Sequence, residues 1–180
     1  MKMNKKDSIA LIGFMATGKT TIGRLLAKAL GEDYQFIETD KLIVNEVGKS
    51  IPQIFQEEGE IKFREYEIQI SKKISHLHKI VVSCGGGIVL NKINIDYLKK
   101  NCYIVLLKAN AEEIYERIMK EGIEKRPKIS ADNPKEQIKN LLEQRENHYM
   151  NAAEIIINTT GKRKTEVITE ILRKTYISNK

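Results

Sequence analysis

Four residues close to the N-terminus have the types and spacing of a phosphate-binding loop. Gly13, Gly18, Lys19 and Thr20 occupy the fixed positions of the pattern G-x-x-x-x-G-K-[ST]. In such a loop, glycines let backbone N–H groups turn toward an anion, the lysine reaches the outer phosphates and the hydroxyl holds Mg²⁺. A chance match in an ordinary turn is the alternative, but an apolar run precedes the loop and an amphipathic stretch follows it. The motif predicts bound ATP and leaves the phosphate acceptor open.

An arginine interrupts an apolar helical stripe near the C-terminus. Ile138, Leu141, Leu142 and Tyr149 recur at helical spacing, and Arg145 falls on the same face. A buried arginine needs a partner or an anionic ligand. An arginine at the rim of the stripe would instead extend its guanidinium into water. This feature alone leaves both interpretations open.

Glu67 interrupts a second stripe, which runs from Phe63 to Ile74. Arg64 precedes Glu67 by three residues, so the two side chains can pair on one helix face. An exposed pair would contribute only tenths of a kcal/mol and would indicate no function. The alternative is that Glu67 orients Arg64 toward a carboxylate ligand, whose two oxygens match the guanidinium fork.

Two short polar or glycine-rich segments follow apolar runs. "ETD" at 38–40 contains Asp40, which could cap a helix that begins at Lys41 or could accept a hydroxyl proton near a phosphate loop. "SCGGG" at 83–87 could be a flexible turn, but three glycines at a strand end favour close approach of a ligand. The second interpretation is preferred because ligands of open α/β sheets bind at that edge.

Five short apolar runs alternate with helical patterns. The runs are 8–12, 34–37, 80–83, 102–107 and 154–157. Helical spacing is clearest over 22–30 and 167–172. This alternation predicts an α/β fold with a mostly parallel five-stranded sheet that helices cover on both faces.

Helix starts are also visible in the sequence. Asn110 followed by Glu113 is a capping-box pattern, and Asn133 followed by Glu136 is another. Pro134 suits the first helical position after the second cap. The polar segment 122–132, just before that cap, has neither a strand nor a helix period, and its length predicts a mobile connector.

The composition is that of a soluble globular chain of one domain. The 180 residues are 41% hydrophobic and 31% charged, and no apolar run has the length of a membrane span. The polar segment Met1–Asp7 has no hydrophobic signal core, which predicts a cytoplasmic location. The net charge of +7 is compatible with nucleic acid, but the scattered lysines favour anionic small molecules.

Taken together, these segments resemble the shikimate kinases, small P-loop enzymes of the nucleoside-monophosphate-kinase group. The resemblance runs from Ile9 to about Leu172. It rests on "GFMATGKTTIGRLLAKAL", "ETD", "FREYE", "SCGGG", "KRP" and "QRENHY", in the order and approximate spacing of that family. It implies a three-layer P-loop kinase fold with a mobile lid over about 122–132. It also implies transfer of the γ-phosphate of MgATP to the 3-hydroxyl of shikimate, in aromatic amino-acid biosynthesis.

The resemblance also implies roles for individual residues. The expected ATP-binding residues are Gly13, Ala16, Thr17, Gly18, Lys19, Thr20, Thr21, Arg117, Arg126 and Lys162. The expected shikimate-binding residues are Asp40, Arg64, Glu67, Gly86, Gly87 and Arg145. Lys19, Asp40 and Arg126 are the expected catalytic residues, with Asp40 as candidate base and Arg126 arriving with the lid. Thr20 is expected to ligate Mg²⁺ directly, and Glu38 through water.

Two residues depart from the family pattern. Ala16 stands where the family usually has glycine, which predicts a slightly stiffer loop. Glu38 replaces the usual aspartate and lengthens the reach to the metal by one methylene. Both changes are expected to affect magnesium geometry rather than the activity.

Two rival functions fit parts of the sequence. One is a different small-molecule kinase on the same fold, acting on gluconate or a nucleoside monophosphate. The other is a non-catalytic module that binds nucleotides or nucleic acid through its positive charge. The motif set favours a kinase whose partners are ATP and shikimate, with no nucleic-acid or membrane partner. The sequence leaves the oligomeric state open, and a monomer is expected because no extra interface element stands out.

Overall fold

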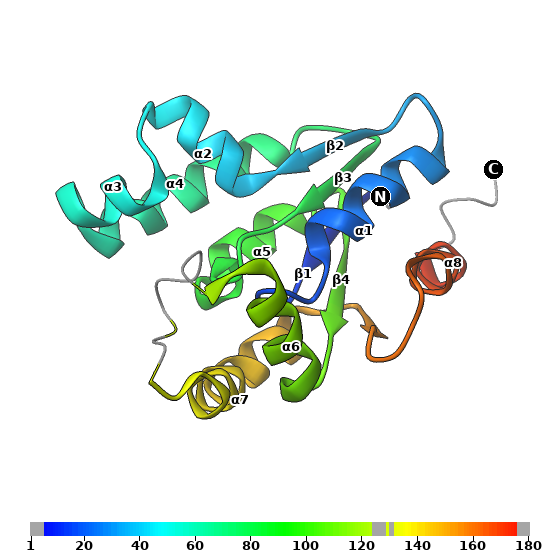
Figure 1. Ribbon diagram of the computed structural model, residues 1–180. Helices are drawn as coiled ribbons and strands as arrows, with labels where there is room; N and C mark the ends of the chain where they lie inside the picture. Colours follow the sequence, from blue (N-terminus) through cyan, green and yellow to red (C-terminus); the bar gives the residue numbers. More distant parts are fainter. Residues whose placement is uncertain (1–5, 124–128, 130–131, 176–180) are drawn as a thin grey trace.

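A five-stranded parallel sheet forms the centre of the molecule (Figure 1). The computed structural model describes residues 6–123, 129 and 132–175. The strands are β1 Ser8–Ile12, β2 Gln35–Glu38, β3 Ile80–Ser83, β4 Cys102–Lys108 and β5 Ile155–Asn158. Their order is β2-β3-β1-β4-β5, and each neighbouring pair is parallel. All five apolar runs therefore form strands, as the sequence predicts.

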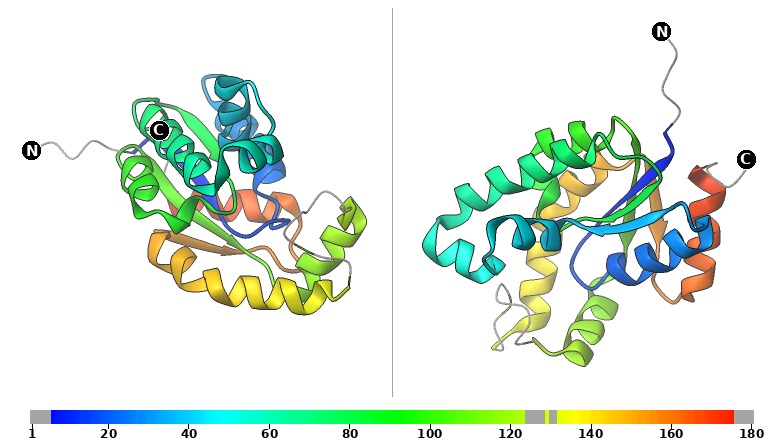
Figure 2. Two further views of the ribbon diagram at one scale, coloured as in Figure 1. Left: turned by 90° about the vertical axis from the view of Figure 1, so that its left-hand side faces the viewer. Right: turned by 90° about the horizontal axis from the view of Figure 1, so that it is seen from above.

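Helices cover both faces of this sheet (Figure 2). They are α1 Lys19–Leu30, α2 Thr39–Val47, α3 Ile51–Glu57, α4 Gly59–Ile74, α5 Lys92–Leu98, α6 Ala111–Glu121, α7 Pro134–Ala152 and α8 Lys164–Thr175, with a 3₁₀ turn at Ile88–Leu90. Helices α1 and α8 pack on one face, while α4, α5 and α7 pack on the other. The three-layer prediction is confirmed.

The central strand explains why the apolar runs are continuous. Ile9 and Leu11 of β1 belong to the core beneath α1 and α8, whereas Ala10 and Ile12 belong to the core on the opposite face. All four side chains are fully buried. A strand that is covered on both faces needs apolar residues at every position, so no polar alternation appears in its sequence.

The two predicted helix caps have different outcomes. Asn110 Oδ1 accepts a hydrogen bond from the Glu113 N–H at 2.8 Å, but Thr160 rather than Glu113 accepts from the Asn110 N–H. Asn133 precedes α7 with Pro134 at the first position, yet its side chain accepts no capping bond among the described residues. Its amide instead contacts the Glu136 carboxylate, so the second capping-box prediction is wrong.

Parallel strands bring the predicted functional segments to one edge of the sheet. The segments 13–18, 39–40 and 84–87 directly follow β1, β2 and β3. Helix α2 begins at Thr39, so Asp40 lies inside its first turn and does not cap a helix beginning at Lys41. The helix-capping interpretation of Asp40 is therefore wrong, which favours the other interpretation of its carboxylate.

Much of the expected lid cannot be placed. Residues 124–128, 130 and 131 lie outside the described residues, and Arg126 is among them.

None of the described helices is both long enough and apolar enough to cross a lipid bilayer.

Candidate active site

The loop 13–18 has the backbone geometry of a phosphate cradle. Gly13 and Gly18 have φ values of 140° and 95°, which lie in the region that favours glycine. A Cβ on Gly13 would lie 2.4 Å from the carbonyl oxygen of Leu107, so β4 approaches this residue too closely for any side chain. The loop leads directly into α1, whose N-terminus attracts anions.

Lys19 and Thr17 hold the shape of this loop. The Lys19 ammonium donates to the carbonyl oxygens of Gly13 at 2.8 Å and Phe14 at 2.7 Å, which places the charge across the mouth of the loop. The buried Thr17 hydroxyl donates to the Phe14 carbonyl at 2.8 Å. The side chain of Thr17 therefore supports the loop from within, while Lys19 lies on its open side.

Ala16 adopts a left-handed backbone conformation, with φ at 57°. Its carbonyl oxygen accepts a hydrogen bond of 3.0 Å from the guanidinium of Arg117 on α6. Arg117 also pairs with Glu113, whose second oxygen accepts from the Gly161 N–H at 3.2 Å. These contacts tie the phosphate loop to α6 and to the turn after β5.

Three oxygen-bearing side chains meet beside the loop. The Thr20 hydroxyl donates to Glu38 Oε2 at 3.2 Å and lies 3.3 Å from the Ser83 hydroxyl. Glu38 also pairs with Lys41 and, at 3.6 Å, with Arg24. A hydroxyl and a carboxylate fit Mg²⁺, which prefers oxygen ligands and takes only one or two from the protein when phosphates are bound. Ser83 is a member of this group that sequence reasoning missed.

Asp40 lies in a partly desolvated position between the loop and the glycine turn 85–87. Burial raises the pKa of its carboxyl group, and the positive charges of Lys19 and Arg64 oppose that rise. A Cβ on Gly85 would lie 2.5 Å from Asp40 Oδ1, so the absence of a side chain at 85 makes room for the carboxylate. Sequence reasoning missed this role of Gly85, since it needs the spatial contact between two strand ends.

Arg64 packs against the same glycine turn. Its guanidinium donates to Glu67 at 2.7 Å and to Glu60 at 2.6 Å. Glu67 is 1% exposed, so this is not the surface pair of the alternative interpretation. A Cβ on Gly87 would lie 2.6 Å from Arg64 Nη1, so any other residue at 87 would displace the guanidinium from this position.

Arg145 approaches the turn from α7 on the opposite side. It is 9% exposed, so the interpretation as a rim arginine is wrong. Its Nη1 donates to the Gly86 carbonyl oxygen at 3.4 Å, and the Tyr149 hydroxyl donates to that same oxygen at 2.6 Å. No carboxylate among the described residues pairs with Arg145. A buried guanidinium with only neutral acceptors is suited to an anionic ligand.

A cavity of about 350 Å³ lies between the phosphate loop and the glycine turn. Its lining residues are Met15, Ala16, Gly18, Lys19, Thr20, Thr21, Glu38, Asp40, Ser83, Cys84, Gly85, Gly86 and Glu121. Its two walls approach each other at Gly86, because a Cβ there would lie 3.8 Å from the carbonyl oxygen of Gly13. A molecule beside Gly86 therefore lies next to the phosphate loop. Arg64 and Arg145 do not line this cavity, but Arg64 lies against Gly87 and Arg145 contacts the Gly86 carbonyl.

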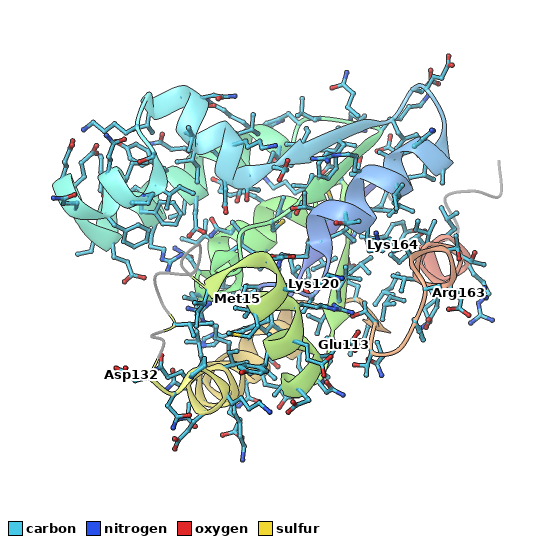
Figure 3. The ribbon with its side chains drawn as sticks, viewed as in Figure 1. Met15, Glu113, Lys120, Asp132, Arg163 and Lys164 are labelled. Atoms are coloured by element: carbon cyan, nitrogen blue, oxygen red, sulfur yellow. The ribbon has the colours of Figure 1, made fainter. Side chains whose placement is uncertain are left out.

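A second cavity of about 350 Å³ lies on the other side of the loop. Its lining residues are Ala16, Thr17, Gly18, Thr21, Ile22, Arg117, Lys120, Glu121, Thr159, Lys162, Lys164 and Val167. Figure 3 labels Lys120 on α6 and Lys164 at the start of α8, two of its basic residues. Lys162 pairs with Glu170 at 2.6 Å. Arg117 and Lys162, predicted for nucleotide binding, thus share one cavity.

Sequence comparisons agree with this arrangement. A family model described as shikimate kinase matches residues 15–176. A shikimate kinase of Caldanaerobacter subterraneus subsp. tengcongensis is 42% identical over 92% of this chain and 94% of its own length. One from Hahella chejuensis is 37% identical over 96% of this chain and 88% of its own length.

Solved structures give the same result. A shikimate kinase from Acinetobacter baumannii in complex with shikimate has a TM-score of 0.85 and 31% identity, covering 97% of this chain and 95% of that one. A shikimate kinase from Aquifex aeolicus has a TM-score of 0.75 and 33% identity, covering 96% and 97%. A gluconokinase from Sinorhizobium meliloti, at 16% identity and a TM-score of 0.55 over 96% and 93%, shares the fold alone.

Proposed function

The chain belongs to the shikimate kinase family, and from that premise we propose how its residues perform the reaction. It is an ATP-dependent kinase that transfers the γ-phosphate of ATP to the 3-hydroxyl of shikimate, giving shikimate 3-phosphate and ADP. The observation that best supports our assignment of the acceptor site is Arg145, a buried cation without a carboxylate partner among the described residues.

The phosphate loop and Lys19 bind the phosphates of ATP. Gly13, Ala16, Thr17, Gly18 and Thr21 supply the cradle, and Arg117 and Lys162 line the cavity for the base. Thr20 would hold Mg²⁺ directly and Glu38 would hold it through water, and a metal bound there would supply charge neutralisation at the phosphate oxygens. Lys19 adds a fixed positive charge at the point where the transferring group develops negative charge.

The acceptor binds through its carboxylate. Arg64 and Arg145 bind the carboxylate from opposite sides of the glycine turn. Glu67 orients Arg64, and Gly86 and Gly87 contact the ring. This grip aligns the 3-hydroxyl with the terminal phosphate, and alignment supplies a large part of the rate in phosphoryl transfer.

Asp40 accepts or positions the proton of the attacking hydroxyl. Its raised pKa makes the carboxylate a better proton acceptor than an exposed aspartate. Arg126, outside the described residues, is proposed to approach the phosphates as part of a lid over about 122–132, in a single domain spanning 1–180. Lid closure excludes water as a competing acceptor.

We propose that the protein is a monomer, that it works in the cytoplasm and that it has no nucleic-acid or membrane partner. Size-exclusion chromatography with light scattering tests the first point. The mass of one 20.7 kDa chain is expected across a range of protein concentrations, and a dimer mass would contradict it.

A coupled ADP-release assay tests the activity and its acceptor. Purified protein with MgATP is supplied separately with shikimate, gluconate and AMP. Shikimate-dependent ADP release is expected, with little above background for the other two acceptors. Equal turnover of gluconate or AMP would reject the acceptor assignment, and salt-dependent nucleic-acid binding without ADP release would favour the non-catalytic rival.

A further inference from the structure

One buried carbonyl group in the site has two donors of unequal quality. The Gly86 oxygen accepts from the Tyr149 hydroxyl at 2.6 Å and from Arg145 Nη1 at 3.4 Å. Ordinary N–H···O bonds are about 2.9–3.0 Å long, and O–H···O bonds are about 2.7–2.8 Å long. The phenol therefore satisfies most of this carbonyl's hydrogen-bonding need, and the guanidinium makes only a long contact.

The two donors come from one face of one helix. Arg145 and Tyr149 are four residues apart on α7, and both are buried, Tyr149 at 5% exposure. The hydroxyl is thus held by the packing of its ring rather than by solvent. Burial raises the pKa of Tyr149 to about 12, opposed by the charge of Arg145 and by a side-chain hydrogen bond between the two residues. The phenol therefore keeps its proton at neutral pH and can donate.

We propose that Tyr149 is a positioning residue for the acceptor site, and that it acts by keeping Arg145 available to the substrate carboxylate. The proposal rests on the proposed function. Tyr149 does not touch the substrate in this account. Its hydroxyl satisfies the Gly86 carbonyl so that the guanidinium need not do so.

Loss of this hydroxyl has a definite structural consequence. A buried carbonyl without a donor is costly, and the nearest remaining donor to Gly86 is Arg145. The guanidinium would shorten its 3.4 Å contact to satisfy this oxygen and so turn an N–H group away from the ligand. A carboxylate ligand would then lose part of a charge-assisted pair, which is stronger than an ordinary hydrogen bond.

The variant Tyr149→Phe isolates the hydroxyl because the ring stays in place. We expect the KM for shikimate, and its Kd by calorimetry without ATP, to rise about tenfold, the equivalent of about 1.4 kcal/mol. The KM for ATP is expected to stay within about twofold, because the phosphate loop is untouched. A change in kcat larger than the change in KM would overturn the proposal.

Tyr66→Phe is a matched control. The Tyr66 hydroxyl donates to Glu58 at 2.7 Å, so this variant removes a hydrogen bond of similar length from α4 outside the cavity. Both variants should lose thermal stability, Tyr149→Phe more because its hydroxyl is buried, but only Tyr149→Phe should raise the KM for shikimate. An unchanged shikimate KM in Tyr149→Phe would show that its hydroxyl is merely structural.

A double-mutant cycle tests whether Tyr149 acts through Arg145. In an Arg145→Leu background, Tyr149→Phe should change kcat/KM for shikimate by less than about twofold, since the guanidinium is already absent. A full tenfold effect in that background would overturn the proposed route. Wild-type protein that binds no shikimate would instead reject the proposed function itself, so the two failures are distinguishable.

Discussion

At the scale of single residues, the proposed acceptor site depends on polar groups that interrupt apolar stripes. The stripe pattern alone left Arg145 and the Arg64–Glu67 pair undecided between structure and function. Their burial excludes the rim-arginine and surface-pair interpretations and favours our proposal. Gly85 and Ser83 could not be assigned from sequence. Their neighbours, Asp40 and Thr20, come from other strands, and only the strand pairing brings them into contact.

The substitution Arg145→Leu should separate binding from stability. Leucine suits an apolar stripe and removes a buried charge, so the melting temperature should stay the same or rise. Loss of a charge-assisted pair should raise the KM for shikimate about 10- to 100-fold. Steady-state kinetics and thermal unfolding measure the two effects.

Arg173→Leu is the control for that experiment, because this arginine is exposed on α8. Its kinetics should match the wild type. A large drop in melting temperature for Arg145→Leu, with an unchanged KM, would mean that Arg145 is a structural residue.

The substitution Asp40→Asn should lower activity and raise stability together. Removing a general base should lower kcat about 10²- to 10⁴-fold. The folded-state pKa of Asp40 is raised, so the folded protein holds this proton more tightly and the ionised group costs stability as pH rises. A neutral amide avoids that cost, and the melting temperature at neutral pH should increase.

The pH dependence provides a second measurement. Wild-type activity should fall as pH drops through the raised pKa of Asp40, because the ionised form accepts the proton. The residual activity of Asp40→Asn should lack this fall at low pH. The control variant Asp96→Asn changes an exposed residue that pairs with Lys92, and its activity should still show the fall. If Asp40→Asn kept near-normal kcat, the carboxylate would have no part in the proton transfer.

At the scale of elements, strands were predicted better than caps. Strand positions follow from apolar runs that are covered on both faces, and this requirement leaves a clear local signal. Cap geometry depends on which partner each side chain finds. Thr160 occupies one partner position at Asn110, and Asn133 contacts a carboxylate instead of a backbone N–H group.

The phosphate loop contains a local conflict between residue type and backbone. Ala16 has a positive φ, a conformation that costs a non-glycine residue about 1–2 kcal/mol. Ala16→Gly would remove that cost but add about 0.5–1 kcal/mol of unfolded-state freedom. The net gain is about 0–1.5 kcal/mol, so the melting temperature should stay the same or rise by up to about 6 °C.

Ala27→Gly is the matched control, because Ala27 has an ordinary helical position in α1 and is buried. That variant should be destabilised by about 1 kcal/mol or more. Calorimetry of both variants measures the difference. Equal losses of stability in Ala16→Gly and Ala27→Gly would mean that Ala16 is unstrained. The Arg117 contact would then stabilise its left-handed backbone conformation.

At the scale of the whole molecule, much of the positive charge is locally paired. Lys49, Lys62, Lys79, Lys92 and Lys135 each lie within 3.0 Å of a carboxylate oxygen. The strand order could not be derived from the apolar runs alone, because pairing partners are remote in sequence and only the family resemblance implied the arrangement.

Because the five strands run in one direction, the segments proposed to bind ligands and the segments that only connect elements lie at opposite rims of the sheet. The described segments 13–18, 39–40 and 84–87 follow strands and project from one rim, which Arg64, Arg117 and Arg145 reach from helices. The segments 31–34, 76–79 and 99–101 connect elements at the other rim. Substitutions at the first rim can change the acceptor specificity with little effect on the sheet. Substitutions at the second rim can change the thermal stability without altering the catalysed reaction. Lineages carrying this architecture can thus adapt to temperature and to substrate by independent routes.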